Sequence, residues 1–117
     1  MKYRKLGNTN IDVSVICLGT MTFGEQNSQQ DGFNQMDYAV ERGVNFFDTA
    51  ELYPVPATPD KYADTEKIIG NWFSKTGNRD KVILATKIAG PGDYTAHIRK
   101  TGFKGNSINE AVEGSLK

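Results

Sequence analysis

The spacing of apolar residues divides the chain into short extended segments and longer helical ones. Residues 3–6 and 11–14 are extended candidates on either side of residues 7–10 (GNTN), whose glycine and asparagines favour a tight turn. They predict an opening β-hairpin. The run of residues 13–18 is apolar on both faces apart from Ser14, a pattern typical of a strand covered on both sides in a parallel sheet.

Helical spacing follows this strand and two further buried strand candidates, residues 44–47 and 82–85. The predicted helices carry apolar faces made by Phe33, Met36 and Val40, by Ile68, Ile69, Trp72 and Phe73, and by Ile108, Ala111, Val112 and Leu116. Gly43 and Gly77 are expected to end the first two helices. Ser107, three residues before a glutamate, is expected to cap the third helix as part of a capping box.

The predicted order of elements is therefore a hairpin over residues 1–14 and three βα units over residues 15–117. Consecutive predicted strands start roughly 30 residues apart or more, as in a βαβ unit with its crossover helix. A doubly wound sheet and a (β/α)8 barrel both begin in this way. The first strand–helix turn lacks the G-x-G-x-x-G sequence that binds phosphates in doubly wound folds, which favours the barrel.

Composition and charge limit the kinds of partner. Lysine and arginine total 14, as do aspartate and glutamate, so the net charge gives no attraction to nucleic acid or to an anionic membrane. No apolar run near the start approaches the ~20 residues of a membrane-spanning helix, and residues 1–14 lack the apolar core of a signal peptide. A cytoplasmic location is therefore expected. Cys17 is the only cysteine, which excludes an internal disulfide, and its apolar neighbours predict a buried side chain.

Polar residues at strand ends are the candidates for chemistry. Asp48 directly follows the second predicted strand, and Lys87 follows the third with one threonine between. The active sites of barrels lie at the C-terminal ends of the strands, so this carboxylate and ammonium are expected to meet there. Tyr53 lies in the next loop, where a nearby ammonium would stabilise the phenolate that forms when its proton leaves. Taken singly, the aspartate also fits a turn cap, the lysine a solvated strand end and the tyrosine a packing role.

Several of these segments resemble the aldo-keto reductase family. Residues 43–53 (GVNFFDTAELY) look like the family signature around its catalytic aspartate and tyrosine, and residues 84–87 (LATK) like the strand with its catalytic lysine. Residues 17–21 (CLGTM) resemble the family's first-strand turn, and both ends of the chain fit as well. Many relatives have glycine after the tyrosine, whereas residues 54–56 (PVP) and a longer polar segment follow here, which is similar to the bacterial Tas-like branch.

The resemblance implies an α/β fold of the TIM-type (β/α)8 barrel class, present only as the N-terminal β-hairpin and the first three βα units, with the hairpin at the end opposite the site. It implies NADP(H) as cofactor and a small-molecule aldehyde or ketone as substrate, reduced by hydride transfer. In the catalytic roles that it implies, Tyr53 donates the proton, Lys87 promotes that transfer and Asp48 orients Lys87. The residues it places near the nicotinamide are Gly19, Thr20, Met21 and Asp48.

The family's fourth catalytic residue, a histidine at the end of the fourth strand, has no counterpart in these residues. His97 lies instead in the loop of residues 90–106, where a solvated or substrate-side position is expected. The same loop is rich in glycine and carries Arg99, Lys100 and Lys104. It is interpreted as a mobile surface loop, with contact to an anionic ligand as the alternative.

The length of the chain bears on its activity. A complete barrel of this kind takes ~250 residues and three strands cannot close one, so we expect an incomplete N-terminal part that does not work alone. Two alternatives stay open. One is a non-catalytic binding or regulatory subunit on the same scaffold. The other is an inactive truncated chain that self-associates through its exposed strand edges. Neither the carbonyl substrate nor the oligomeric state follows from the sequence.

Overall fold

Two small sheets, three helices and two short 3-10 turns make up the structure. The computed structural model describes residues 1–117. β1 (Tyr3–Lys5) and β2 (Asp12–Ser14) form an antiparallel hairpin, and β3 (Leu18–Gly19), β4 (Phe46–Asp48) and β5 (Ile83–Ala85) form a parallel sheet in that order. The helices are α1 (Gln29–Glu41), α2 (Asp64–Thr76) and α3 (Ser107–Leu116), and the 3-10 turns are η1 (Asn78–Lys81) and η2 (Asp93–Thr95). The predicted architecture, a hairpin followed by three βα units, is confirmed.

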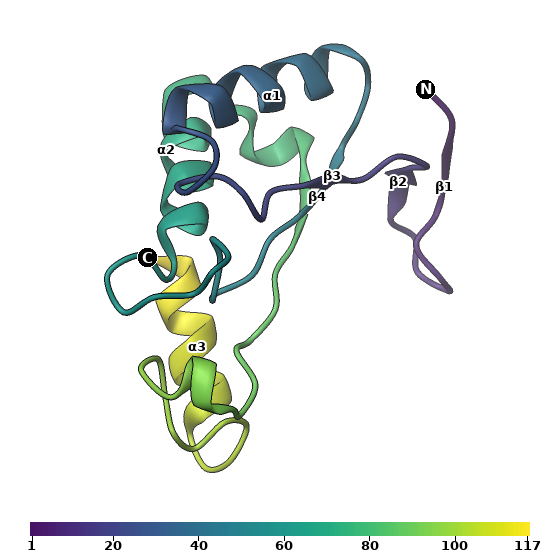
Figure 1. The fold of residues 1–117 in the computed structure, drawn as a ribbon. Helices are drawn as coiled ribbons and strands as arrows, with labels where there is room; N and C mark the ends of the chain where they lie inside the picture. The colour runs from purple at the N-terminus through teal and green to yellow at the C-terminus, as the bar shows by residue number, and fades with distance from the viewer.

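The core lies between the parallel sheet and the helices α1 and α2. Its buried apolar residues are Phe23, Phe33, Met36, Ala39, Val44, Phe47, Ile68, Ile69, Trp72 and Val82. The faces predicted for the first two helices supply half of this set, because helical spacing brings residues three and four apart onto one side. The indole Nε1 of Trp72 donates to Asp37 Oδ1 at 2.8 Å and so ties α2 to α1. Figure 1 shows α1 running across the upper end of α2, with the hairpin standing apart from both helices.

Both predicted helix stops are present. Gly43 (φ 86°) and Gly77 (φ 70°) follow α1 and α2 in the left-handed region, which glycine adopts without steric cost. The N-terminus of α1 carries a capping box: the Asp31 amide donates to Ser28 Oγ at 3.1 Å, and the Ser28 amide donates to Asp31 Oδ2 at 2.9 Å. None of the three helices is long and apolar enough to cross a membrane.

The prediction for the third helix is wrong in two respects. Asn106 is the N-cap of α3, and Ser107 is its first helical residue, with no side-chain cap. The Ser107 hydroxyl pairs with the hydroxyl of Thr101 in the preceding loop instead, so it is not available to the helix amides. Of the predicted apolar face only Ala111 is buried, because α3 lies beyond the layer that α1 and α2 form on the sheet. The yellow helix in Figure 1 shows this position.

Residues 13–18 are not the single buried strand that their apolar pattern predicts. β2 ends at Ser14 and β3 begins at Leu18, and between them the chain passes from the hairpin to the parallel sheet. The side chains of Val15 and Ile16 are 53% and 57% exposed. Cys17 is also exposed, which corrects its predicted burial. An apolar run predicts a buried strand only where a partner strand continues alongside it, and this connection has none.

The hairpin is fixed to the N-terminal end of β4. The Tyr3 hydroxyl donates to the Gly43 carbonyl at 2.6 Å. Asn45 makes a reciprocal pair with Ser14: the Ser14 amide donates to Asn45 Oδ1 at 2.7 Å, and the Asn45 amide donates to Ser14 Oγ at 3.2 Å. Since β4 ends at Asp48, the hairpin and the candidate catalytic aspartate lie at opposite ends of the same strand, as the family resemblance implies.

Ile69→Val is expected to lower the free energy of unfolding by about 0.5–1.5 kcal/mol, because the lost methylene leaves a gap in a packed core. Ile69 is 1% exposed. The same substitution at exposed Ile16 is the matched control and is expected to change stability by less than about 0.5 kcal/mol. Urea denaturation followed by Trp72 fluorescence measures both variants. Equal losses at the two positions would contradict the placement of Ile69 in the core.

Candidate active site

The pairing of β4 with β5 aligns the ends of these strands. Asp48 is paired with Ala85 in the parallel register. The ladder then continues past both strands, because the Thr49 amide donates to the Ala85 carbonyl at 2.9 Å and the Glu51 amide donates to the Lys87 carbonyl at 3.0 Å. Lys87 is thereby held beside the segment that begins with Asp48. The two residues predicted to meet at the C-terminal ends of the strands do so.

The Lys87 ammonium is bound by three oxygen atoms. It donates to both carboxylate oxygens of Asp48, at 2.8 and 2.7 Å, and to the Thr49 carbonyl at 2.7 Å. Partial burial on its own lowers the pKa of Lys87, but the hydrogen bond and charge of Asp48 outweigh it, with added support from Tyr53, so the pKa is raised. Lys87 is therefore a cation at neutral pH. Its side chain is 49% exposed and that of Asp48 is 41% exposed, which leaves the pair open to a ligand.

Tyr53 completes the predicted group. The Lys87 Nζ atom lies 5.0 Å from the centroid of the Tyr53 ring, within the range of a cation–π contact. The Tyr53 amide donates to the Ala50 carbonyl at 3.1 Å, and the Tyr53 carbonyl accepts from the Thr65 amide at 3.4 Å. The backbone of Tyr53 is thus held both by its own turn and by the first turn of α2. All three predicted catalytic residues are close together.

The turn after β3 lies against Asp48 on the other side. Gly19 is paired with Asp48 in the sheet register. The amide and hydroxyl of Thr20 both donate to the Asp48 carbonyl, at 3.1 and 2.8 Å, and Thr20 is completely buried. Met21 is exposed, and its carbonyl accepts from the Val55 amide at 3.3 Å. Among the residues predicted to contact a cofactor, Gly19 and Met21 are therefore open, whereas the Thr20 hydroxyl is already used within the protein.

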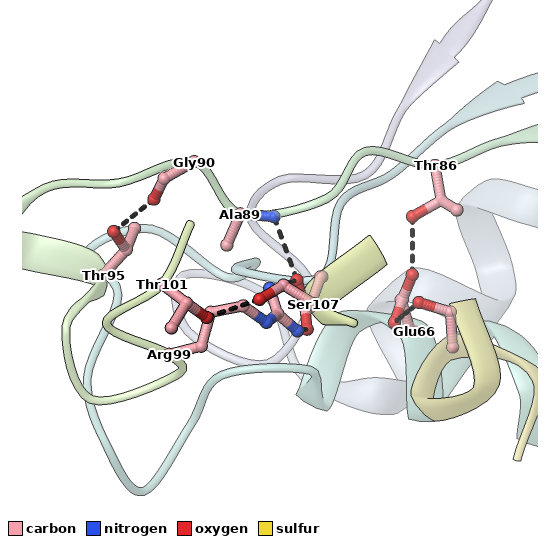
Figure 2. Close-up of polar contacts among 10 residues, drawn as sticks. Glu66, Thr86, Ala89, Gly90, Thr95, Arg99, Thr101 and Ser107 are labelled. Carbon is pink, nitrogen blue, oxygen red and sulfur yellow. Dashed lines mark hydrogen bonds and ion pairs between the residues drawn. The ribbon is translucent and has the colours of Figure 1, made fainter. Parts of the chain in front are cut away.

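A buried ion pair that the sequence analysis missed lies directly behind the site. The Glu51 carboxylate is bound by both terminal nitrogens of Arg99, with Nη1 to Oε2 at 2.7 Å, and accepts from the Ala89 amide at 2.9 Å. The Arg99 and Glu51 side chains are only 12% and 9% exposed. Arg99 therefore lies against the protein and is not available to an anionic ligand in this arrangement. Figure 2 shows its guanidinium among the residues of the loop.

The electrostatics of this pair follow from its burial. Burial on its own raises the pKa of Glu51, but the hydrogen bonds from Arg99 and Ala89 and the charge of Arg99 outweigh it and lower the pKa. The hydrogen bond from Glu51 likewise raises the pKa of Arg99. Both groups are charged at neutral pH. The only feature of the sequence that could have indicated this ion pair is Glu51, two positions before Tyr53, together with Arg99 in the basic loop.

His97 lies in the loop between β5 and α3, as predicted. Its ring meets that of Tyr62 edge-on, with centroids 5.8 Å apart, and its Nε2 atom is buried without a hydrogen-bond partner. Tyr62 belongs to the loop that leads from Tyr53 to α2. His97 therefore packs between the loops that follow β4 and β5, and it is not at the end of a strand.

Comparison with known proteins agrees with this geometry. A model of the aldo/keto reductase family matches residues 15–117. The chain belongs to the aldo/keto reductase family. Members of this family are oxidoreductases that act on small-molecule carbonyl compounds. The matched residues include Asp48, Tyr53 and Lys87.

Individual relatives match the whole chain. Protein Tas of Escherichia coli is 44% identical over 119 residues, which cover 100% of this chain and 34% of Tas. The uncharacterized oxidoreductase YrpG of Bacillus subtilis is 42% identical over 122 residues, covering 100% of this chain and 36% of YrpG. The holo form of the aldo-keto reductase AKR11C1 from Bacillus halodurans superposes with a TM-score of 0.72 at 31% identity, covering 99% of this chain and 35% of that one.

These likenesses confirm the two expectations on family and fold. The match to protein Tas confirms the resemblance to the Tas-like branch. The match to solved aldo-keto reductases confirms the fold class, a TIM-type (β/α)8 barrel of which the hairpin and first three βα units are present. The chain spans about a third of the length of the relatives that it matches.

The pKa of Lys87 is expected to fall in Asp48→Asn, because partial burial, which lowers this pKa, then acts without the opposing carboxylate. An NMR titration of the lysine ε-methylene groups measures the change. The control is Lys61, whose pKa is raised by its hydrogen bond to Glu25 and is expected to stay where it is. If the titration of Lys87 were the same in the variant, Asp48 would not be the source of its raised pKa.

Proposed function

We propose that this chain carries the hydride-transfer end of an NADP(H)-dependent reductase that converts aldehydes or ketones into alcohols, with Asp48, Tyr53 and Lys87 as its catalytic residues. The contact that supports this proposal most directly is the Lys87 ammonium, which lies within 2.8 Å of both Asp48 oxygens and 5.0 Å from the Tyr53 ring. Family membership supports the oxidoreductase class.

The nicotinamide end of the cofactor would be held by Gly19, Met21 and Asp48. Apart from Gly19 and its two chain neighbours, no residue has a heavy atom within 4 Å of the position that a β-carbon on Gly19 would take, and Met21 is exposed, so both residues leave room beside the Asp48 carboxylate. Thr20 supports this surface by fixing the turn to the Asp48 carbonyl. NADP(H), when bound, supplies the hydride. The preference for NADP(H) over NAD(H) is carried over from the family resemblance.

The three catalytic residues divide the proton chemistry among them. Tyr53 gives its phenolic proton to the carbonyl oxygen of the substrate as that oxygen gains negative charge. The Lys87 ammonium offsets the negative charge left on the Tyr53 oxygen, and Asp48 keeps the ammonium in place. These charges already occupy their positions in the protein alone, so little reorganisation is needed during the reaction.

Tyr53→Phe is expected to lower kcat for carbonyl reduction by about 10²-fold or more, because it removes the proton donor and leaves the ring. The measurement uses a barrel-length form, meaning these 117 residues continued by the remaining strands and helices of an aldo/keto reductase barrel. NADPH affinity is expected to change little. Tyr94→Phe, at an exposed position in η2, is the matched control and should retain turnover. Undiminished turnover by the Tyr53 variant would remove Tyr53 from the proposed role.

NADPH binding is expected only in the barrel-length form, because three strands do not close the barrel that surrounds the cofactor. Fluorescence titration of the 117-residue chain and of the barrel-length form, with NADH in parallel, tests this together with the proposed cofactor preference. Binding and turnover by the short chain alone would contradict the expectation. A barrel-length form that binds NADPH but reduces no compound in a broad panel of aldehydes and ketones would favour a binding or regulatory protein.

A further inference from the structure

We propose that Glu51 and Arg99 are positioning residues that hold the backbone around Lys87, so that its ammonium contacts Asp48 and Tyr53 together. The inference rests on the proposed function and adds a second layer to it. Neither the Glu51 carboxylate nor the Arg99 guanidinium is bonded to the Lys87 ammonium or the Asp48 carboxylate. They act on the segment that carries Lys87.

Glu51 binds the Lys87 segment at two points. Its amide donates to the Lys87 carbonyl at 3.0 Å, and its carboxylate accepts from the Ala89 amide at 2.9 Å. Glu51 therefore holds the chain at the Lys87 carbonyl and again at the Ala89 amide. Glu51 is itself held by the Ala63 amide, which donates to the Glu51 carbonyl at 2.9 Å.

Arg99 completes the coordination of the Glu51 carboxylate. The guanidinium binds the two carboxylate oxygens through two separate nitrogens, a geometry that fixes the plane of both groups. Both side chains are about nine-tenths buried, so solvent screens the pair weakly. With the Ala89 amide included, the carboxylate accepts three hydrogen bonds within the protein. Glu51 is therefore unsuited to act as a proton donor or base, and its charge serves to hold neighbouring atoms in place.

A second carboxylate holds the same segment from the helix side. Glu66 of α2 accepts from the Thr86 hydroxyl at 2.6 Å and from the Ser115 hydroxyl at 3.0 Å. Thr86 immediately precedes Lys87. Figure 2 shows Thr86 pointing toward Glu66, with Ala89 and Arg99 grouped in the neighbouring contact network. Residues 86–89 are therefore anchored by Glu66 before Lys87 and by Glu51 after it.

The consequence for catalysis is geometric. The Lys87 ammonium must satisfy Asp48 and still lie beside Tyr53, and a displacement of about 1 Å in such a group is enough to cost up to 10²-fold in rate. Both contacts that Glu51 makes to the Lys87 segment are to backbone atoms, so they limit movement of the Lys87 α-carbon. Arg99 links this arrangement to the loop that leads to α3 and thus to the position of His97 beside Tyr62.

The test is kinetic and uses Glu51→Gln and Arg99→Met in the barrel-length form. We expect kcat to fall by about 10- to 100-fold while the Kd for NADPH stays close to its original value, because the cofactor-facing residues are untouched. The alkaline limb of the pH profile of carbonyl reduction is expected to move to lower pH, since the raised pKa of Lys87 depends on its contact with Asp48 and a displaced Lys87 loses its proton more readily. Loss of stability alone would not move this limb.

The matched control is Glu25→Gln. It removes the carboxylate from another ion pair, Glu25–Lys61, which joins the loops after β3 and β4 without contacting β5. Its kcat and pH profile are expected to match the unsubstituted protein. Glu51→Gln and Arg99→Met variants with unchanged kcat and an unchanged alkaline limb would overturn the proposal.

A double variant separates positioning from folding. Glu51→Gln alone leaves a buried guanidinium without its partner, which destabilises a protein, whereas Glu51→Gln with Arg99→Met removes both charges. We expect the double variant to unfold at a temperature closer to that of the unsubstituted protein and still to show the reduced kcat. Full recovery of kcat in the double variant would show that the pair serves stability only and would overturn the proposal.

A readout without turnover keeps this inference separable from the proposed function. Acetylation of Lys87, followed by mass spectrometry on the 117-residue chain, is expected to be faster in the double variant because the ammonium is held less firmly. Faster acetylation combined with full activity of Tyr53→Phe would reject the proposed function and support the positioning role. Unchanged acetylation combined with an inactive Tyr53→Phe would reject the positioning role alone.

Discussion

The parallel register between β4 and β5 is the constraint on which the rest of the structure depends. It pairs Asp48 with Ala85, and the ladder continues far enough to place Lys87 beside the segment after Asp48. The same register faces Phe47 toward the core under α1 and α2, since successive side chains on a strand alternate between faces. A slip by one residue would exchange the two faces. The packing of the core and the meeting of the candidate catalytic groups are therefore specified by one set of backbone hydrogen bonds.

Two carboxylate–cation pairs lie within a few residues of each other and differ in their surroundings. The side chains of Asp48 and Lys87 are nearly half exposed, so breaking their contact costs little free energy and both groups remain available to a ligand. Glu51 and Arg99 are about nine-tenths buried, where breaking the contact would leave an uncompensated charge inside the protein. The exposed Asp48–Lys87 pair is suited to contact a ligand, and the buried Glu51–Arg99 pair is suited to hold the neighbouring backbone in place. Similar residue types thus take different roles because of their burial.

The sequence predicted those features that depend on local pattern. Helical spacing identified the faces of α1 and α2, and the positions of Asp48 and Lys87 after apolar runs placed them at strand ends. It failed where tertiary contacts decide. Ser107 has the spacing of a cap but bonds to Thr101, and Cys17 has apolar neighbours but lies in an exposed connection.

The buried ion pair was missed for the same reason. Glu51 and Arg99 are 48 residues apart in the chain, and no local pattern links them. In sequence Arg99 belongs to a glycine-rich basic loop, which favours a surface position. Only the folded arrangement, in which the loop after β5 passes behind the loop after β4, brings the guanidinium to a carboxylate. Long-range polar contacts of this kind require the topology before they can be assigned.

The attachment of the hairpin to the start of β4 separates two regions of the molecule that can be altered independently. Its tip, around Gly7, is exposed, and no residue other than the two chain neighbours of Gly7 lies within 4 Å of the position that a β-carbon on Gly7 would take. β4 is only three residues long and ends at Asp48, and the hairpin makes its contacts at the opposite, N-terminal end of this strand. The tip is therefore a natural place to attach a fluorophore or an affinity handle without approaching the cofactor-facing surface.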